Sequence, residues 1–167
     1  MSVKAPARLA RETLYTSPWV NLHVDRVEFP GDRIIERHHF LEFPSKSVGV
    51  LVENEANHLL LVEAYRYVTG TVEWEIPAGH IDGGETVLAA AEREVSEEGG
   101  YATAGHRLVY SFYPIPGIGD ALHHVVYCRS VGQVGTLTGP KCGQCAGFRA
   151  ANCRRCWKPK HCTMVTR

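Results

Sequence analysis

The chain has 167 residues, of which 44% are hydrophobic and 22% are charged. This length and composition are typical of about one globular domain with its own hydrophobic core. No apolar run approaches the roughly 18 residues that a membrane-spanning helix needs, and the first residues lack the apolar segment of a secretory signal. We therefore expect a cytoplasmic protein without a membrane partner.

Charge is divided unevenly along the chain, although 18 basic and 18 acidic side chains give a formal net charge of +0. Asp120 is the last acidic residue, and residues 133–167 hold seven Lys or Arg. Residues 1–132 therefore carry 11 basic and 18 acidic side chains, a formal charge of −7. This acidic body suits an enzyme that binds metal ions and argues against nucleic acid as its main partner.

The N-terminal part of the chain is predicted to form strands. Residues 13–29 alternate between apolar and polar positions, as a half-exposed strand does. A Pro-Gly-Asp turn at residues 30–32 follows, and residues 34–43 complete a hairpin. Residues 47–52 and 58–63 are mainly apolar runs separated by a polar turn, which indicates two core strands.

A strand that ends at residues 74–77 leads through a Gly-rich turn into a predicted helix over residues 86–98. The helix is rich in Ala, Leu and Glu, which are good helix formers, and residues 99–100 are the two glycines that end it. An apolar stripe on this helix would pack against a sheet; its members are Val87, Leu88, Ala91 and Val95.

Three carboxylates of this helix, Glu94, Glu97 and Glu98, are spaced three and four residues apart. An α-helix places such residues on one face, where like charges destabilise a bare helix by roughly a few tenths of a kcal/mol per pair. A divalent cation offsets this repulsion, and oxygen ligands suit Mg²⁺ or Mn²⁺. The cluster predicts a metal site for phosphate chemistry; the alternative is an ordinary solvated acidic helix.

The spacing around the glutamates is that of a known signature. Gly79 is followed after five residues by Glu85, and after seven more by the run REVSEEGGY at residues 93–101. This pattern resembles the Nudix box of the Nudix hydrolases, and every defined position is filled. The resemblance implies an α/β (α+β) fold, an α/β/α sandwich with a mixed sheet, here preceded by a small N-terminal antiparallel sheet. It also implies hydrolysis of a nucleoside diphosphate linked to another group.

Two further features resemble the ADP-ribose pyrophosphatase branch of this family. Tyr65-Arg66-Tyr67 is followed by WEIPAG at residues 74–79, and Pro116 lies about fifteen residues after the box. The branch implies Mg-dependent hydrolysis of ADP-ribose or a related ADP-sugar to AMP and a sugar phosphate, by a homodimer that exchanges its N-terminal sheets. The alternatives are hydrolysis of NADH or of a nucleoside triphosphate, and a catalytically weak sensor that binds a nucleotide.

The resemblance also assigns roles in metal binding and catalysis. It implies that Mg²⁺ or Mn²⁺ is held by the Ala78 carbonyl oxygen and by Glu94, Glu97 and Glu98, of which Glu97 and Glu98 would also help activate water. Arg93 is expected to hold the glutamates in place through an ion pair, for instance with Glu85.

Other residues are candidates for substrate binding. Arg66 is a possible clamp for the diphosphate, with a surface salt bridge as an equal alternative. Trp19 and Phe40 could stack on adenine, and Pro116 is the proline that marks the branch.

The chain departs from the branch at the general base. Many members carry a glutamate after the proline, where this chain has Ala121. Asp120 is therefore the candidate substitute, and a glutamate of the helix is another. His123 and His124 are further candidates, because histidine is a common proton-transfer residue. Neighbours in a strand face opposite ways, so we expect at most one of them to act, and a packed or surface histidine is the favoured interpretation of each.

Residues 107–113 and 122–128 predict two more strands around a Pro/Gly-rich loop. Beyond them, residues 133–167 hold five of the six cysteines, and their composition is typical of an irregular or disordered tail. We thus divide the chain into an N-terminal strand segment at 1–43, a core at 44–132 and a basic Cys-rich tail at 133–167.

The cysteines of the tail allow other interpretations. Two Cys-x-x-Cys pairs are separated by seven residues, a shorter gap than zinc sites usually have, so Zn²⁺ binding is the less favoured reading. Translation in a shifted reading frame is a second hypothesis for the tail, and contact with RNA or DNA is a third. The five cysteines concerned are Cys142, Cys145, Cys153, Cys156 and Cys162.

Overall fold

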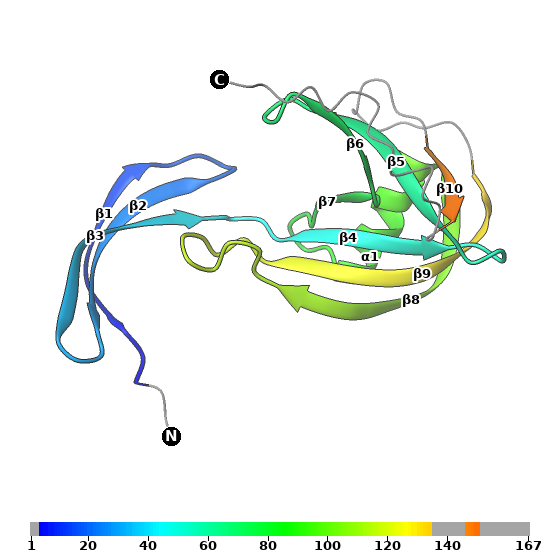
Figure 1. Cartoon of the computed structure of the whole chain (residues 1–167). Helices are drawn as coiled ribbons and strands as arrows, with labels where there is room; N and C mark the ends of the chain where they lie inside the picture. Colours follow the sequence, from blue (N-terminus) through cyan, green and yellow to red (C-terminus); the bar gives the residue numbers. More distant parts are fainter. Residues whose placement is uncertain (1–3, 135–145, 151–167) are drawn as a thin grey trace.

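The computed structural model describes residues 4–134 and 146–150, which form two β-sheets and one α-helix (Figure 1). The first sheet is antiparallel and joins β1 (Ala7–Tyr15), β2 (Asn21–Phe29) and β3 (Arg33–Glu42) in that order. The second has seven strands in the order β10-β5-β4-β9-β8, with β6 paired to β5 and β7 to β4. Its strands are β4 (Ser47–Glu53), β5 (His58–Arg66), β6 (Thr71–Glu75), β7 (Ala78–His80), β8 (Tyr101–Phe112), β9 (His123–Gln133) and β10 (Ala146–Ala150).

The N-terminal sheet corrects one prediction. Residues 13–29 do not form a single strand, because the chain reverses between β1 and β2. Ser17 Oγ donates a hydrogen bond to Val20 O and accepts from Val20 N, and the following Pro18 has no N–H for a ladder. The predicted hairpin of β2 and β3 is confirmed; Gly31 and Asp32 adopt positive φ in its turn.

A buried polar cluster lies within this N-terminal sheet. Arg11 donates two hydrogen bonds to Asp25, at 2.7 and 2.8 Å, and the Asp25 residue is only 6% exposed. The Arg11 guanidinium also lies over the Phe40 ring, 4.8 Å from its centroid. These hydrogen bonds from Arg11 hold the pKa of Asp25 below its ordinary value. One cation therefore neutralises one carboxylate here.

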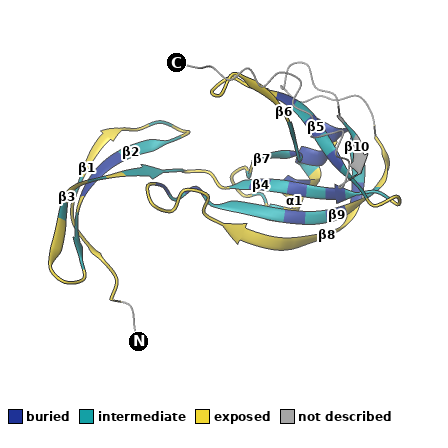
Figure 2. Cartoon of the chain, in the orientation of Figure 1, coloured by how far each residue is buried: buried dark blue, intermediate teal, exposed yellow. Residues whose placement is uncertain are grey.

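The core lies between the mixed sheet and helix α1 (Val87–Glu94). Alternate residues of β4 (Val48, Val50 and Val52) are fully buried, which is the period expected of a strand with one face on a core. β4 runs parallel to β9 and antiparallel to β7, so the sheet is mixed. Figure 2 shows the buried residues concentrated in these central strands and the helix, whereas β1 and β8 are largely exposed. The predicted fold class is confirmed; the described residues supply one of the two helical layers of a sandwich.

The predicted helix consists of two parts. Thr86 caps α1, since its hydroxyl accepts a hydrogen bond from Ala89 N at 3.2 Å. After Glu94 the chain continues as one turn of π-helix, Val95–Gly99, and Gly100 ends it in the left-handed conformation at φ 72°. Single π turns within α-helices are frequent at functional sites.

Strand β10 corrects the prediction that residues 133–167 contain no regular element, because Ala146–Ala150 pairs antiparallel with β5. Backbone groups at a free sheet edge can pair with a chain that has no strand-like side-chain pattern, so composition did not reveal it. The five cysteines of the tail lie outside the described residues. Within the described part of the chain, no helix has the length and apolar character to cross a membrane.

Candidate active site

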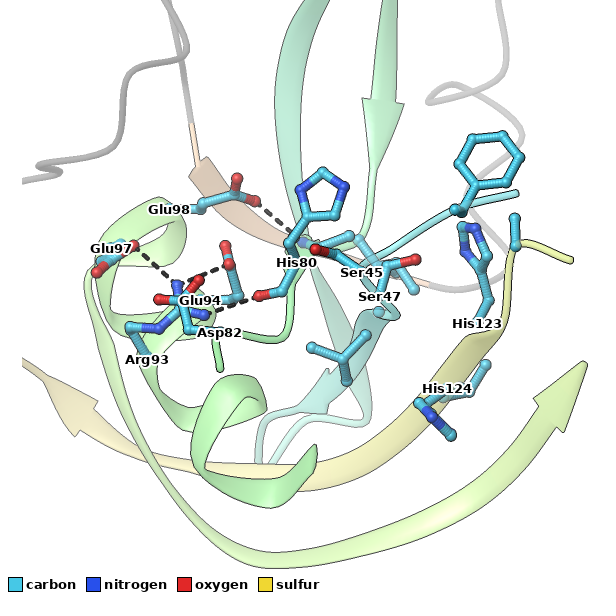
Figure 3. A pocket seen from close by; sticks show the side chains of 18 of the residues that line it. Ser45, Ser47, His80, Asp82, Arg93, Glu94, Glu97, Glu98, His123 and His124 are labelled. Atoms are coloured by element: carbon cyan, nitrogen blue, oxygen red, sulfur yellow. Dashed lines mark hydrogen bonds and ion pairs between the residues drawn. The ribbon is translucent and has the colours of Figure 1, made fainter. Parts of the chain in front are cut away.

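A cavity of about 780 Å³ opens beside the C-terminal half of the helix (Figure 3). Its walls come from elements far apart in the sequence: the segment before and within β4, the β7 strand, the helix and its π turn, and the start of β9. All three predicted glutamates face it, together with Arg93 and Ala78.

Arg93 connects the acidic side chains of the site. Its Nε and Nη2 donate to Glu85 at 3.1 and 3.0 Å, and Nη2 also donates to the His80 carbonyl oxygen at 2.9 Å. Its Nη1 contacts Glu94 Oε1 at 2.8 Å and Glu97 Oε2 at 3.4 Å. The predicted pair of Arg93 with Glu85 is present, and its hydrogen bonds lower the pKa of Glu85.

Glu94 is buried, with 7% of its surface exposed. Its carboxylate lies directly against the backbone of Gly79: a Cβ at residue 79 would come within 2.0 Å of Glu94 Oε1. Only glycine leaves room for this carboxylate, which explains why the sequence motif begins with that residue. Burial raises the pKa of Glu94 although Arg93 opposes the shift, so its charge is poorly compensated by the protein.

Glu98 is fixed by the backbone of Ala78, the residue before Gly79. It is 4% exposed, and its Oε2 accepts a hydrogen bond from Ala78 N at 3.0 Å. Because β7 pairs with β4 through Ala78 and Gly49, this bond ties the π turn to the central sheet. Glu97 is held less firmly, with a side chain that is 43% exposed.

The donors suit a divalent cation by their chemistry. One guanidinium faces Glu85, Glu94 and Glu97, which leaves net negative charge beside the buried Glu98. Carboxylate and carbonyl oxygens are the ligands that Mg²⁺ and Mn²⁺ prefer. No three His, Cys, Asp or Glu side chains of the described residues already converge closely enough to hold an ion. Arg93 Nη1 lies instead between Glu94 Oε1 and Glu97 Oε2, so an ion would be held through the other oxygens of these carboxylates or after they turn away from Arg93.

Of the predicted substrate-binding residues, Arg66 and Trp19 line the cavity. Arg66 forms a two-bond ion pair with Glu75, one bond being Nε to Oε1 at 2.7 Å, and is 44% exposed. The salt-bridge interpretation of Arg66 is thus present in the structure, and its role as a clamp for the diphosphate stays a prediction. The Trp19 side chain is highly exposed, and its ring lies 5.9 Å from that of His80.

Three other predicted site residues lie elsewhere. Phe40 belongs to the N-terminal sheet, where it packs on His23 and Arg11, and Pro116 is exposed on its loop. Asp120 does not line the cavity; its Oδ1 accepts a hydrogen bond from Phe43 N at 2.7 Å. This contact gives Asp120 a structural function, and its role as a base stays a prediction that the geometry does not favour. Ala121, by contrast, lines the cavity.

The structure also brings residues to the cavity that sequence reasoning missed, among them Phe43, Ser45, Ser47 and Phe112. The sequence alone does not single them out, because serine and phenylalanine are common near the ends of strands. Both His123 and His124 line the cavity, which corrects the expectation that one of the two faces away from it. Figure 3 shows their rings pointing in different directions, and His124 Nδ1 lies 2.7 Å from Ser111 Oγ.

A family model of the NUDIX domain matches residues 44–151. This span is more than half of the chain and contains the whole glutamate site. The chain therefore belongs to the Nudix hydrolase family.

Within that family the chain is similar to ADP-ribose pyrophosphatases and to other nucleotide hydrolases. It is 30% identical over 117 residues to the ADP-ribose pyrophosphatase of Bacillus subtilis, which covers 70% of this chain and 62% of that protein. It is also 30% identical over 125 residues to the CMP-5'-(N-acetyl-N-hydroxy-3-aminopropyl)phosphonate hydrolase of Streptomyces rubellomurinus, covering 75% of this chain and 60% of that protein. The matched region thus spans about three fifths of either relative.

A solved structure of an ADP compounds hydrolase has the same fold. It superposes with a TM-score of 0.78 over 90% of this chain and 80% of that chain, at 21% identity. The small antiparallel sheet followed by a mixed sheet thus matches the fold of a protein of known structure.

Proposed function

We propose that this chain hydrolyses the diphosphate bond of ADP-ribose or a related ADP-sugar, with Mg²⁺ or Mn²⁺ bound by Ala78 O, Glu94, Glu97 and Glu98. The observation that carries the proposal is the buried Glu94, whose charge Arg93 compensates incompletely at the wall of a cavity. A carboxylate in that position is costly to the fold unless a cation binds it. The ADP-ribose pyrophosphatase relative supports the choice of substrate.

The residues of the chain would act in defined ways. Arg66 can bind the oxygens of the diphosphate while Glu75 holds the plane of its guanidinium. When bound, the metal ion would polarise the diphosphate and lower the pKa of a water molecule. Glu97 has the mobility to orient that water, because it is the most exposed of the three glutamates. The water oxygen bonds to one phosphorus, the bridging oxygen leaves with the other phosphate, and AMP and a sugar phosphate result.

The nucleobase would stack against Trp19. This side chain is 71% exposed and has only the His80 ring as an aromatic neighbour among the described residues, so one face can accept a ligand. A flat indole binds any base, and a relative acts on a CMP derivative. Hydrolysis of another nucleotide ester is therefore the second candidate function.

We also propose a homodimer. The N-terminal sheet stands beside the core in Figure 1 and is joined to it mainly through the Leu41–Asp120 contacts. It exposes several large apolar side chains, namely Leu9, Leu14, Tyr15 and Ile34. A second copy of the chain would cover such a surface. Light scattering on the purified protein measures this directly, and a monomer at micromolar concentration would rule it out.

A substrate panel tests the proposed reaction. Purified protein is incubated with Mg²⁺ and ADP-ribose, NADH, a CMP ester or nucleoside triphosphates, and released nucleotide is measured by chromatography. We expect AMP from ADP-ribose, no product with EDTA, and a loss of at least about a hundredfold in kcat for Glu98→Gln. Glu92→Gln is the matched control, because Glu92 is exposed on the same helix and does not line the cavity. Tight binding of ADP-ribose without turnover of any substrate would favour the sensor instead.

A further inference from the structure

One end of the cavity is rich in hydroxyl and aromatic groups. We call it the serine end; it is lined by Phe43, Ser45, Ser47, Phe112 and His123. In Figure 3, Ser45, Ser47 and His123 lie on the side of His80 away from Glu97 and Glu98. The cavity therefore offers two chemically different regions to a single ligand.

Strand pairing sets the positions of these side chains. Ser47 pairs with His123 in the parallel β4–β9 ladder, and His123 pairs with Phe112 in the antiparallel β8–β9 ladder. Residues paired across strands project from the same face of a sheet. The rings of Phe112 and His123 are accordingly 5.8 Å apart, with Ser47 on the other flank of the histidine.

The segment that carries Phe43 and the two serines is fixed by hydrogen bonds to the loop before β9. Leu41 N donates to Ile118 O at 2.7 Å, Phe43 N to Asp120 Oδ1 at 2.7 Å, and Ser47 N to Leu122 O at 3.1 Å. Gly119 permits this close approach, because a Cβ there would lie 3.2 Å from Leu41 O. The serine end is thus a preformed surface.

Among the residues that the structure describes, the polar side chains of this end have no hydrogen-bond partner. Within the described part of the chain, no hydrogen bond reaches the side chains of Ser45, Ser47 or His123, although the neighbouring His124 has a partner in Ser111. The carboxylates at the other end are, in contrast, bonded to Arg93 or to backbone. Hydroxyl and imidazole groups that face a cavity in this way are available to a ligand.

The charge of the serine end indicates what kind of group it binds. No Lys, Arg, Asp or Glu side chain lines it, so it offers no counter-ion to a chain of phosphates. Neutral donors and acceptors that line a cavity together with two phenylalanines suit a group that has both hydroxyls and apolar C–H faces.

We propose that the serine end binds the sugar of the leaving group and selects sugar-linked nucleoside diphosphates over nucleotides without a sugar on the second phosphate. This inference rests on the proposed function, since it assigns the second half of that substrate. Ser45 and Ser47 hydrogen-bond the sugar hydroxyls, and Phe112 with His123 covers one face of the ring.

The test compares ADP-ribose with the methyl ester of ADP, which has the same scissile bond and no sugar. We expect Ser47→Ala and Ser45→Ala each to lower kcat/KM for ADP-ribose by about three- to tenfold, the effect of one lost neutral hydrogen bond. Activity toward the methyl ester should change less than about twofold. Ser130→Ala is the matched control, because it alters a serine of β9 that does not line the cavity.

Equal losses on both substrates, or no loss on either, would overturn the proposal. Activity on the methyl ester shows that each variant is folded, and Ser45, which is exposed, provides a second variant should Ser47→Ala not fold. If the wild-type protein hydrolyses neither ADP-ribose nor the methyl ester, the proposed function is wrong, and this result by itself does not decide the role of the serine end. Calorimetry with the same two compounds then decides: tighter binding of ADP-ribose that is lost in Ser47→Ala supports the serine end, and equal affinities reject it.

Discussion

Two arginine–carboxylate clusters in this chain differ in how their charges are balanced. In the N-terminal sheet, Arg11 serves the single carboxylate of Asp25 and lowers its pKa. At the cavity, Arg93 serves Glu85, Glu94 and Glu97 together, and the pKa of Glu94 is raised by burial. In the first cluster one positive charge therefore balances one negative charge. The second has a deficit of positive charge that a bound cation would correct, and this difference supports the second cluster as the proposed metal site.

The largest expected effect comes from displacing Glu94. The Cβ of Gly79→Ala would overlap the Glu94 carboxylate, which can swing aside at little cost to the fold because it is the end of a flexible side chain. Misplacement of a reacting group by about 1 Å can reduce catalysis roughly a hundredfold, and we expect a loss of that size in kcat for ADP-ribose with an unchanged melting temperature. Gly83→Ala in the turn after β7 is the control, because its Cβ would meet nothing within 4 Å. Equal activity in both variants would show that the Gly79 contact is irrelevant.

The next effect concerns the stability that the Arg11–Asp25 pair gives to the fold. Asp25→Asn removes the charge that pairs with Arg11, and we expect a loss of about 2 kcal/mol in the free energy of unfolding at neutral pH. Because the pKa of Asp25 is lowered, its stabilisation is complete above the ordinary aspartate value and is lost as pH falls through the lowered one. Urea unfolding should therefore show a gap between wild type and variant that closes in acid.

A control for this stability effect lies in the same sheet. Arg26 and Glu36 form a similar but exposed pair between β2 and β3, with Nε and Oε2 2.7 Å apart. Exposed pairs contribute little, so Glu36→Gln should leave the unfolding curve nearly unchanged. If Glu36→Gln were as damaging as Asp25→Asn, burial would not be what distinguishes the two pairs.

The smallest expected effect comes from adding a carboxylate to the cavity that the three glutamates line. Ala121 lines the cavity, and the resemblance to the ADP-ribose pyrophosphatase branch implies a glutamate at this position. Ala121→Glu should raise kcat for ADP-ribose by about tenfold, a modest part of what a well-placed base contributes. Steady-state kinetics at saturating Mg²⁺ measures it, with Ala121→Gln as the uncharged control. An equal response to both substitutions would assign the effect to side-chain size.

Local features of the structure were predictable from the sequence, and non-local ones were not. The helix over 86–98 and the grouping of its glutamates follow from helical periodicity, which depends on near neighbours alone. Strand β7 has three residues and β10 five, too few for a side-chain pattern. The serine end depends on the pairing of Ser47 with His123, a parallel contact between strands far apart in the chain. Neither residue type nor spacing indicates such a contact.

Some errors have a simple local cause. The strand predicted over 13–29 ignored Ser17 and Pro18, which turn the chain between β1 and β2. The strands around the Pro/Gly loop were predicted too short, because β8 continues through bulges that include Gly105 at φ 69°. Bulges interrupt alternation without ending a strand, so a strict period of two underestimates such strands.

The π turn at Val95–Gly99 makes the glutamate site sensitive to chain length. A π turn accommodates one residue more than an α turn, and each helical residue rotates the next by roughly 100°. Removing a single residue there would restore an ordinary α-helix and would turn Glu98 away from Ala78 N. Sequence comparisons that place a gap inside this turn would consequently align glutamates that face different directions in space.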